Sequence, residues 1–446
     1  MSDLTPDELL TEIYNVFQPF EPPPEGTYVN CEEVRGRWDV VRELGKQIVR
    51  SKQPTCQLYS GHRGVGKTTE LLRLREYLQG RGYHVVYFAV EEDVETQDAE
   101  YADILFACTK NLVQSVELRD HNPLVEWMRE RWQSLKELAL TDLEFDSLSL
   151  EQQVSQFAKI TASVQAVPDI RRELRKKLSD STPSLLAALN GFIAEAQRQI
   201  SPACKGIVVI ADNLDRIAEN NTDGRSNFDE IYINRSEPMR GLACHVIYTV
   251  PIQMIYSPRV TRLEDYYSKP DVLPMVMVKS LAGEVNQAGV DKLKEVICRR
   301  LQRVDPQLTE EIDTQVFDSA ATLDRLCMMS GGHMRVLMQL LQRSMDWIDE
   351  LPITAEAVQI AIEEQRNTYQ MAIRGNRWAV MAQAHRSKRF DNEDSSLELL
   401  LNRCLVEYRY YDSQTQLRQW CDVHPLIEGF EPFREALAKL DATSGD

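Results

Sequence analysis

Eight consecutive residues carry the best-defined chemistry in this chain, the segment Gly61-His62-Arg63-Gly64-Val65-Gly66-Lys67-Thr68. Glycines at these spacings allow a backbone to curl around a polyphosphate with its N–H groups pointing inward. In such a loop the lysine reaches the β- and γ-phosphates, and the hydroxyl that follows it is a ligand for Mg²⁺. We therefore predict that residues 61–68 and Thr69 bind a nucleotide, that Lys67 is also catalytic, and that Thr68 is also a metal ligand.

The segments on either side of this loop have the patterns that phosphate binding requires. Residues 56–59 are predicted to form a short buried strand, and residues 68–78 a helix with Leu71, Leu74 and Leu78 on one face. A helix that begins at the loop points the positive end of its dipole at the phosphates. These flanks favour a true phosphate-binding loop over a glycine-rich turn that matches the pattern by chance.

A second apolar run, residues 207–210, is followed closely by a carboxylate, that of Asp212. Such a run is typical of a strand buried on both faces of a parallel sheet. At the end of that strand Asp212 can hold Mg²⁺ through water, opposite Thr68. The next residue, Asn213, carries an amide, which cannot act as a base. We predict that Asp215 takes that task or that hydrolysis is slow; alternatively, Asp215 caps a helix and pairs with Arg216.

Further strands are predicted at residues 83–90, 244–250 and 272–278, and the long stretch 99–200 is predicted to be helical. Strands separated by helical segments indicate an α/β fold with a parallel sheet, which binds its ligand at the carboxyl ends of the strands. Thr249 lies at such an end. Its hydroxyl either senses the γ-phosphate and contributes to catalysis, or belongs to an ordinary β-branched strand residue.

The composition sets wider bounds. A chain of 446 residues with 43% hydrophobic and 27% charged residues is typical of a globular protein, and its length suggests about three domains. No apolar run approaches the ~20 residues that span a bilayer, and the acidic N-terminus lacks signal-peptide features, so we expect a cytoplasmic protein without a membrane partner. Nine scattered cysteines indicate reduced thiols. A net charge of −18 argues against a surface that coats nucleic acid, although it allows a local basic patch.

Taken in order, these motifs resemble those of the AAA+ and STAND ATPases, which include origin-recognition initiators and the NACHT and NB-ARC switches. The chain has the phosphate-binding loop, a strand followed by Asp-x-Leu-Asp, a strand that ends in threonine, and then the segment 330–335. The resemblance implies a P-loop NTPase fold with a parallel sheet, a helical insertion, an all-α lid and a C-terminal winged-helix domain. It also implies ATP or ADP with Mg²⁺ as ligands and slow, regulatory ATP hydrolysis.

Two motifs carry the resemblance to particular site residues. The segment from Asp212 to Asp215 is similar to the NACHT form of the Walker B motif, in which a downstream acidic residue shares the catalytic work, so Asp212 and Asp215 are both expected to be catalytic. Many ATPases of this type have a glutamate at the position of Asn213. The segment 331–335 resembles the sensor-2 region, so Arg335 is expected to bind the γ-phosphate from the lid and to be catalytic. The alternative is a helix-breaking turn followed by a surface arginine.

The C-terminal part has the pattern of a winged helix. Residues 405–411 and 419–427 are predicted to be the two wing strands, joined by the polar turn 412–416. The segment 423–426 resembles the Met-His-Asp region of STAND switches, which implies that His424 binds the diphosphate of ADP. The methionine and the aspartate of that motif are both absent here, and a packed structural histidine is the alternative.

We predict four segments. These are an N-terminal helical segment at 1–54, a P-loop ATPase core at 55–283 that includes the helical insertion 99–200, a lid at 284–370, and a winged-helix domain at 371–446. ATPases of this class usually take an arginine from a neighbouring subunit, because a guanidinium stabilises charge on the transferring phosphate. The candidates for this arginine are Arg235, Arg240, Arg259 and Arg262, and most of them are expected to be surface residues.

Two functions fit this set of features. The favoured one is an ATP-dependent switch of the STAND type, which forms a homo-oligomer with ATP bound and signals to a separate sensor or effector protein. Family analogy alone points further, to bacterial conflict or defence. The alternative is a DNA-associated AAA+ ATPase that resembles the replication initiators or transposition regulators. It rests on the basic residues Arg374, Arg377, Arg386, Lys388 and Arg389, but Asp391, Glu393 and Asp394 follow directly, so nucleic acid is not the favoured partner.

Overall fold

The computed structural model describes residues 4–443 apart from 117, 119–121, 136–151, 154, 157, 161–165, 180, 201–202, 223–224, 374 and 390–392. The chain forms two compact units. The first, here called the sheet unit, comprises Val40–Ser60 and Glu70–Asp271. The second, the lid unit, comprises Met1–Asp39, Gly61–Thr69 and Val272–Asp446. The phosphate-binding loop therefore belongs to the lid unit, while the strands that precede and follow it in sequence belong to the sheet unit.

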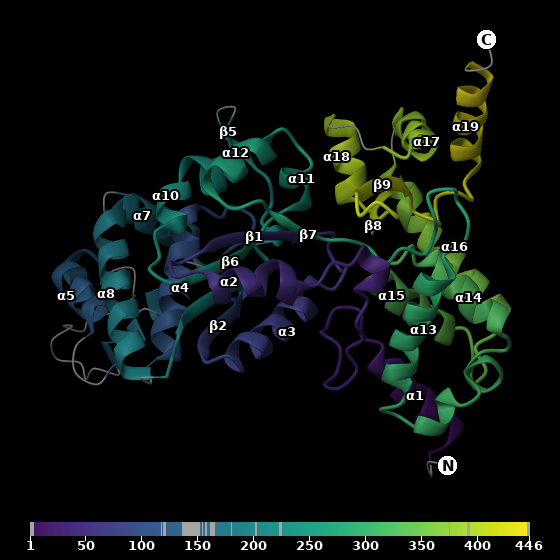
Figure 1. The fold of residues 1–446 in the computed structure, drawn as a ribbon, viewed down its shortest axis with the longest axis horizontal. Coiled ribbons are helices and arrows are strands. Elements are labelled where there is room, and N and C mark those ends of the chain that lie inside the picture. The colour runs from purple at the N-terminus through teal and green to yellow at the C-terminus, as the bar shows by residue number, and fades with distance from the viewer. Residues whose placement is uncertain are drawn as a thin grey trace. The chain divides into compact units, whose positions relative to one another are not determined.

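The sheet has the strand order β2-β3-β6-β1-β7 (Figure 1). The strands are β1 (Cys56–Gly61), β2 (Tyr83–Ala89), β3 (Gly206–Asp212), β6 (His245–Thr249) and β7 (Asp271–Leu273). The pairs β2–β3, β3–β6 and β1–β6 are parallel. Every residue of β3 is buried, as expected for a central strand covered on both faces. The predicted α/β fold with a parallel sheet is confirmed.

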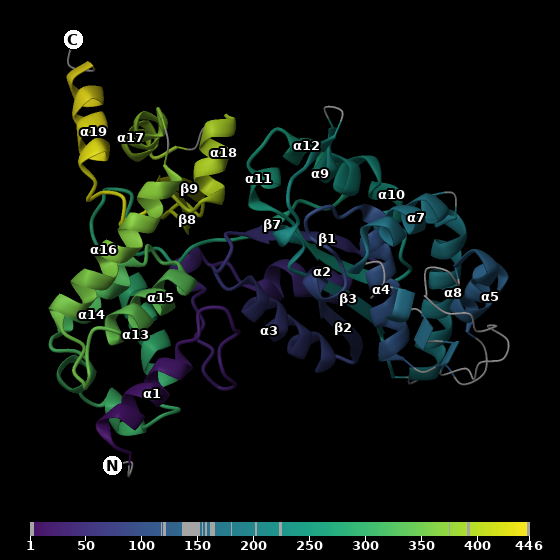
Figure 2. The ribbon, with the colours of Figure 1, turned by 180° about the vertical axis from the view of Figure 1, so that it is seen from behind.

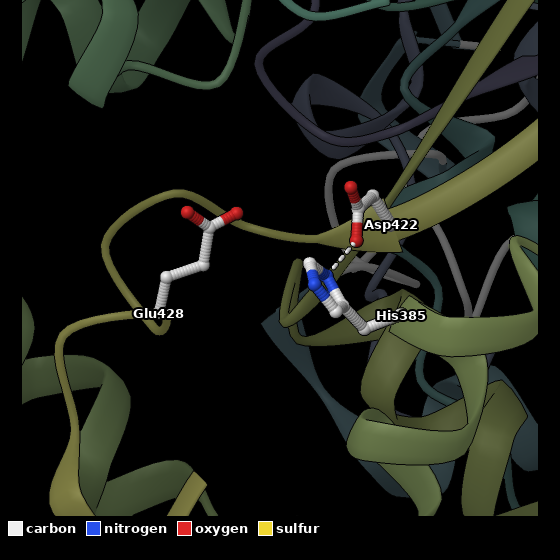
Figure 3. A group of neighbouring side chains, drawn as sticks. All are labelled: His385, Asp422 and Glu428. Carbon is white, nitrogen blue, oxygen red and sulfur yellow. Dashed lines mark hydrogen bonds and ion pairs between the residues drawn. The ribbon is translucent and has the colours of Figure 1, made fainter. Parts of the chain in front are cut away.

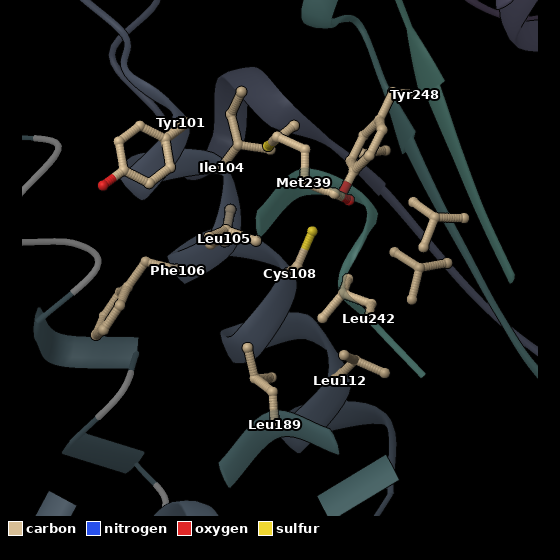
Figure 4. Packing of buried hydrophobic residues seen from close by; sticks show 14 of the residues in the cluster. Tyr101, Ile104, Leu105, Phe106, Cys108, Leu112, Leu189, Met239, Leu242 and Tyr248 are labelled. Carbon is tan, nitrogen blue, oxygen red and sulfur yellow. The ribbon is translucent and has the colours of Figure 1, made fainter. Parts of the chain in front are cut away.

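The helices of the sheet unit supply its core. They are α2 (Lys46–Arg50), α3 (Lys67–Gln79, whose first turn is in the lid unit), α4 (Tyr101–Ser115), α5 (Pro123–Leu135), α7 (Pro168–Ser179), α8 (Thr182–Ile200), α9 (Asn227–Asp229), α10 (Ser236–Arg240), α11 (Ile252–Ile255) and α12 (Arg259–Tyr266). Helix α4 contacts β2 and β3, and α8 contacts β3. Figure 4 shows Ile104, Cys108 and Leu112 of α4 packed with residues such as Tyr248 of β6, and all four are buried.

This arrangement gives part of the stretch 99–200 a structural role. Its first and last described helices, α4 and α8, bury apolar side chains such as Phe106 and Leu189 against the sheet and the segments around it. Much of the remainder of the stretch, including residues 136–151, lies outside the described residues. A two-residue ladder, β4 (Asn221–Thr222) with β5 (Arg225–Ser226), follows β3 in the chain.

The lid unit is mostly helical (Figure 2). Its elements are α1 (Pro6–Val16), α13 (Gln287–Leu301), α14 (Ala320–Met329), α15 (Met334–Met345), α16 (Ala355–Ala372), α17 (Arg377–Ser387), α18 (Asp394–Leu401), β8 (Leu405–Tyr411), β9 (Leu417–Val423) and α19 (Glu431–Thr443). Helix α15 packs against α14, α16 and α1. The antiparallel hairpin β8–β9 follows α17 and α18 in the chain, and helix–helix–hairpin is the order expected of a winged helix.

Two predicted strand boundaries were wrong. The strand predicted at 272–278 is the short β7, which ends at Leu273 because Pro274 has no N–H to continue the ladder. The second wing strand was predicted at 419–427 but spans Leu417–Val423. It ends before His424-Pro425, where the backbone N–H of His424 instead donates to the carbonyl of Cys404. In both places a proline marks the end of regular pairing.

Two global predictions concern the whole chain. None of the helices within the described ranges combines the length and the apolar character needed to cross a bilayer. All nine cysteines belong to the described part and are free thiols, as predicted from their scattered positions.

Candidate functional site

The phosphate-binding loop has the backbone that its glycines predict. Gly61, Gly64 and Gly66 have φ values of 149°, 88° and 109°, which residues with a Cβ rarely adopt. Lys67 begins α3, and its buried ammonium donates to the carbonyls of Gly61 at 2.9 Å and His62 at 3.0 Å. These bonds hold the positive charge inside the loop. The backbone N–H groups of a glycine-rich loop and a fixed ammonium are the hydrogen-bond donors that a polyphosphate needs, so these residues fit ATP or ADP.

The N-terminal segment supports the same loop. The guanidinium of Arg35 donates through Nη2 to the carbonyl of Val65 at 2.8 Å, and the side chain is buried. Arg35 lies in a short helical turn, Glu33–Arg35, which contacts α13 and β8. The sequence gave no signal that Arg35 would bond the loop.

The N-terminus of lid helix α15 contacts the loop directly. His333 caps this helix, and its Nε2 donates to the carbonyl of Arg63 at 2.7 Å. The backbone N–H of Arg335 donates to the carbonyl of Gly64 at 3.1 Å. The approach is so close that a Cβ on Gly64 would lie 2.7 Å from both the Arg335 Cβ and the His333 Cε1. The lid and the loop therefore form one packed element.

The guanidinium of Arg335 is held by the N-terminal segment. Its Nε donates to the carbonyl of Pro19 at 3.2 Å, and the group lies over the ring of Phe20, 5.2 Å from the ring centroid. The backbone of Arg335 thus contacts the loop, while its guanidinium contacts Pro19 and Phe20 of the N-terminal segment. Binding of a γ-phosphate by Arg335 would require this side chain to exchange these contacts, and the role stays a prediction.

The C-terminal part joins the lid one turn before α15. His424 is fully buried, its Nε2 donates to the carbonyl of Ser330 at 3.1 Å, and its Nδ1 accepts from the N–H of Leu426 at 3.3 Å. Its ring stacks on Tyr369 with centroids 4.9 Å apart. Both ring nitrogens are used within the protein, which is the behaviour of a packed structural histidine. Contact of His424 with a diphosphate stays a prediction.

Three buried histidines lie within this arrangement. Burial, and then the charges of Lys67 and Arg403, lower the pKa of His62 to about 3. Burial and then Arg403 likewise lower the pKa of His424 to about 3 and place that of His333 well below its ordinary value. All three rings are therefore neutral at pH 7. Arg403, which lies between α18 and β8, connects the C-terminal part electrostatically to the loop.

The sheet unit contains the Walker B residues. Asp212 ends β3 and is fully buried, and its Oδ2 accepts from the hydroxyl of Tyr87 at 2.9 Å while its Oδ1 accepts from the N–H of Asn213 at 2.7 Å. A carboxylate at the carboxyl end of a central strand is the group that such ATPases use to hold Mg²⁺ through water, and this role of Asp212 stays a prediction. Burial and the charge of Asp212 raise the pKa of Tyr87, which keeps that phenol protonated as a donor.

Asp215 and Thr249 lie close to this segment. The hydroxyl of Thr249 accepts from the N–H of Leu214 at 2.8 Å and is fully buried. It thereby fixes the turn that follows Asp212, and γ-phosphate sensing by Thr249 stays a prediction. Asp215 lies in that turn, Leu214–Arg216, and its side chain is buried. Burial, and then the charge of Asp215, raise the pKa of the core residue Tyr232.

The predicted arginine fingers differ in their surroundings. Arg259 pairs with Glu219 and Asp229, both at 2.8 Å, and Arg235 pairs with Glu230 at 3.0 Å. Arg262 lies 3.9 Å from Asp229, with about half of its side chain exposed, and Arg240 is exposed. Arg262 and Arg240 would need to give up least to reach a neighbouring subunit. The choice among the four remains a prediction.

One cluster of metal-ligand types occurs in the C-terminal part. The ligand atoms of His385, Asp422 and Glu428 all lie within 4.8 Å of one another, and Figure 3 shows the imidazole directed at Asp422. Asp422 accepts from His385 Nδ1 at 2.5 Å and from Lys388 Nζ at 2.7 Å, and Glu428 pairs with Lys279. Two lysines already neutralise the two carboxylates, so the cluster serves as an ion-pair network that joins α17 to β9.

The basic cluster that supports the DNA-binding alternative is also largely paired. Arg377 pairs with Glu398, Arg386 lies 3.7 Å from Asp441, and Lys388 bonds Asp422. Arg374 of this patch, and Asp391 of the acidic residues that follow it, lie outside the described residues. Cations that are held by neighbouring carboxylates present less positive potential to phosphates.

Sequence reasoning missed four residues that the structure connects to the site. These are Glu91, which accepts a bond from Asn213, and Arg35, His333 and Arg403, which surround the phosphate-binding loop. Only His333 had a signal, its position as the residue before a helix that follows two glycines. The others are distant in sequence from the parts of the site that they influence, and periodicity carries no information about such pairs.

The comparisons with known proteins agree with the loop and the sheet. Residues 33–225 match the family model described as the AAA ATPase domain. This segment contains the phosphate-binding loop, β1 to β3 and Asp212. No curated protein matches the chain closely enough to count as a relative.

Several solved structures resemble the chain over nearly its whole length. The Aeropyrum pernix ORC1 protein in complex with DNA has 10% identity and a TM-score of 0.39, covering 98% of this chain and 97% of that one. Cdc6p from Pyrobaculum aerophilum has 11% identity and a TM-score of 0.37, covering 96% and 98%. The Aeropyrum pernix ORC2 protein, in ADPNP–ADP complexes, has 13% identity and a TM-score of 0.40, covering 96% and 98%. At these values the molecules bound to those proteins have no bearing on this chain.

The glycine backbone with its fixed lysine, the parallel sheet and the buried Asp212 at the end of β3 are thus found in a segment with the sequence of an AAA ATPase domain. They agree with the presence of an AAA ATPase domain in this segment, residues 33–225.

Proposed function

We propose that this protein is a nucleotide-dependent switch, which binds ATP with Mg²⁺, hydrolyses it slowly and changes the packing of its lid and C-terminal part in response. One observation carries the proposal. An unbroken series of contacts within the lid unit runs from the phosphate-binding loop, through the start of α15, to the β8–β9 hairpin. A ligand that rearranges the loop must therefore alter contacts that hold the C-terminal part.

The contacts in this series are close, although not all of them are buried. The carbonyls of Arg63 and Gly64 accept hydrogen bonds from the His333 ring and from the Arg335 backbone N–H. Gly332 packs closely against the backbone of Val276, because a Cβ on Gly332 would lie 1.8 Å from the Val276 carbonyl oxygen. The carbonyl of the preceding residue, Gly331, accepts from the Tyr408 hydroxyl at 2.9 Å. Packed interfaces of this kind change between discrete arrangements and do not deform continuously.

Each group has the chemistry that the motifs predict for it. Lys67 and the loop N–H groups would bind the β- and γ-phosphates, and Thr68 and Asp212 would hold Mg²⁺, which supplies charge neutralisation at those phosphates. Arg335, Thr249 and Asp215 keep the catalytic roles predicted from the motifs, and an arginine of a neighbouring copy would complete the site. ATP-dependent homo-oligomerisation and signalling to a separate sensor or effector protein belong to the same proposal.

The test combines mass in solution with ATP turnover, for the full chain with ATP, with ADP and without nucleotide. We expect ATP to change the mass or shape, slow turnover, and loss of both in Lys67→Ala. Lys46→Ala, at an exposed lysine of α2, is the matched control and is expected to behave as wild type. A protein that stays monomeric and hydrolyses ATP only when duplex DNA is added would replace the switch with the DNA-associated alternative.

A further inference from the structure

Arg403, in the turn between α18 and β8, has the left-handed backbone that usually requires glycine. Its φ is 62°, and it lies just beyond the last residue of α18, Leu401, and the cap that follows it. Its N–H donates to the carbonyl of Leu400 at 3.0 Å, and the N–H of Cys404 donates to that of Leu399 at 2.8 Å. These two bonds form a Schellman motif, in which a left-handed residue, most often glycine, satisfies the last carbonyls of a helix.

The backbone of this motif gives no reason for an arginine. A side chain in the left-handed region crowds the carbonyl that follows it, whereas glycine avoids this cost. The turn before α15 shows the usual choice, since Gly331 and Gly332 have φ values of 62° and 78°. Strained residues without such a glycine are concentrated at functional sites. The reason for Arg403 therefore has to come from its guanidinium.

This guanidinium lacks a counter-ion in the part of the chain that the structure describes. The Arg403 side chain is half-buried, and none of the described residues forms an ion pair or a hydrogen bond with its guanidinium. The acid in the second half of α18, Glu398, pairs with Arg377 instead. A cation that has lost part of its hydration is normally compensated by an anion. Arg403 is thus suited to bind an anionic ligand.

Hydrogen bonds within the lid unit connect Arg403 to the phosphate-binding loop. The carbonyl of the next residue, Cys404, accepts from the N–H of His424 at 2.9 Å. The His424 ring bonds the carbonyl of Ser330, in the turn that leads to α15. His333, the cap of α15, then bonds the loop carbonyl of Arg63 at 2.7 Å. The turn that carries Arg403 is therefore joined to the loop through two histidines.

The charge of Arg403 also acts on the loop itself. Burial is the largest cause of the low pKa of His62, the second residue of the loop, and the charges of Lys67 and Arg403 lower it too. The backbone of Leu400, in the last turn of α18, opposes this shift. For the pKa of His333, Arg403 is the largest cause after burial. The guanidinium thus adds to the positive field that Lys67 creates at the loop.

We propose that Arg403 binds a phosphate group of the nucleotide in the loop, an inference that rests on the proposed nucleotide-dependent function. A guanidinium donates charge-assisted hydrogen bonds to phosphate oxygens. The motifs assign contacts of this kind to His424 and Arg335. Both ring nitrogens of His424 are bonded within the protein, and Arg335 donates to the carbonyl of Pro19. Arg403 carries a free charge instead, and through it the nucleotide contacts the C-terminal part directly.

Equilibrium dialysis of the full chain against ATP, ADP and inorganic phosphate, each with Mg²⁺, tests this contact. Arg403→Gln removes the charge, and Arg403→Gly removes the charge and also relieves the backbone. We expect both variants to bind ATP, or both nucleotides, about 10-fold more weakly than wild type, as the loss of a charge-assisted hydrogen bond implies. Arg403→Gly should also unfold at a higher urea concentration, so that its weaker binding cannot result from poorer folding.

The matched control is Arg418→Gln, at a surface arginine of β9 that pairs with Asp412. It removes the same charge and is expected to bind nucleotide as wild type does. The proposal is overturned if both Arg403 variants bind ATP and ADP as tightly as wild type, or if Arg418→Gln loses as much affinity. It is also overturned if only the binding of inorganic phosphate weakens, which indicates a separate anion site, or if Arg403→Gly unfolds at a lower urea concentration.

The failure of this inference is distinct from the failure of the proposed function. If the wild type binds neither ATP nor ADP, the proposed function fails and the role of Arg403 fails with it. If the wild type binds nucleotide, Lys67→Ala does not, and the Arg403 variants bind normally, only the role of Arg403 is wrong.

Discussion

At the scale of single residues, backbone geometry decides which side chains the phosphate-binding loop tolerates. Gly64 has a φ of 88° and is in contact with the lid, whereas Gly283 has nearly the same φ, 87°, with no atom within 4 Å of its Cβ position. A side chain at either position would therefore incur similar backbone strain, and only at Gly64 would its Cβ also clash with neighbouring side chains.

We expect Gly64→Ala to lower the free energy of unfolding more than Gly283→Ala does. Both variants incur about 1–3 kcal/mol of backbone strain, and the clash with His333 and Arg335 adds about 1–3 kcal/mol at Gly64 alone. Urea unfolding of the two variants measures the difference. Equal losses would show that the lid does not rest on the loop in solution.

The same residue scale explains the amide in the Walker B segment. Asn213 suits a left-handed backbone, and its side-chain amide donates to Glu91, which follows the neighbouring strand β2. A motif search along the sequence cannot detect this contact, because the two residues are 122 positions apart.

At the scale of elements, the start of α15 is the point where three segments meet. Its cap contacts the loop, and the turn before it, residues 330–332, accepts bonds from the C-terminal part. The hairpin strand β8 contributes Tyr408, which is fully buried, to this turn. Tyr411 is on the same strand and is 42% exposed, so it provides a control of the same chemistry.

We expect Tyr408→Phe to cost about 1–2 kcal/mol of unfolding free energy, because it removes the donor to a buried carbonyl at Gly331. It should also make the C-terminal part more susceptible to proteolysis in the folded protein. Tyr411→Phe is expected to change the unfolding free energy by less than about 0.5 kcal/mol. Identical stability and proteolysis of the two variants would contradict the proposed connection between hairpin and lid.

At the scale of the whole molecule, the three neutral buried histidines make stability depend on pH. An unfolded histidine has a pKa of about 6.5, and the folded values for His62 and His424 are about 3. Between these values the unfolded chain binds more protons, so the free energy of unfolding is highest above about pH 6.5 and falls as the pH decreases. Each histidine contributes up to about 1.4 kcal/mol per pH unit.

Urea unfolding of wild type and His424→Gln between about pH 7.5 and about pH 5 tests this contribution. The variant should be less stable at neutral pH, since it loses packing against Tyr369, but its stability should fall less steeply as the pH decreases. The expected difference in slope is about 1.4 kcal/mol per pH unit. Parallel pH profiles would mean that His424 takes up its proton without unfolding.

The sequence by itself determined the fold class, the strands β1, β2, β3 and β6, and the phosphate-binding loop. These features depend on local patterns, namely runs of apolar residues, glycine spacing and a helix that begins at Lys67. Strand ends next to Pro274 and Pro425 were predicted less well, because hydrophobicity continues past the residue at which hydrogen bonding stops.

Only the tertiary structure decided which side chains meet. It placed His333 and Arg35 on the phosphate-binding loop, gave His424 two protein partners, and brought Glu91 to Asn213. Each of these contacts joins segments far apart in the chain, and its geometry depends on strand register or helix packing. Residue types and spacing constrain neighbours along the chain, whereas contacts between distant segments are fixed only when the core packs.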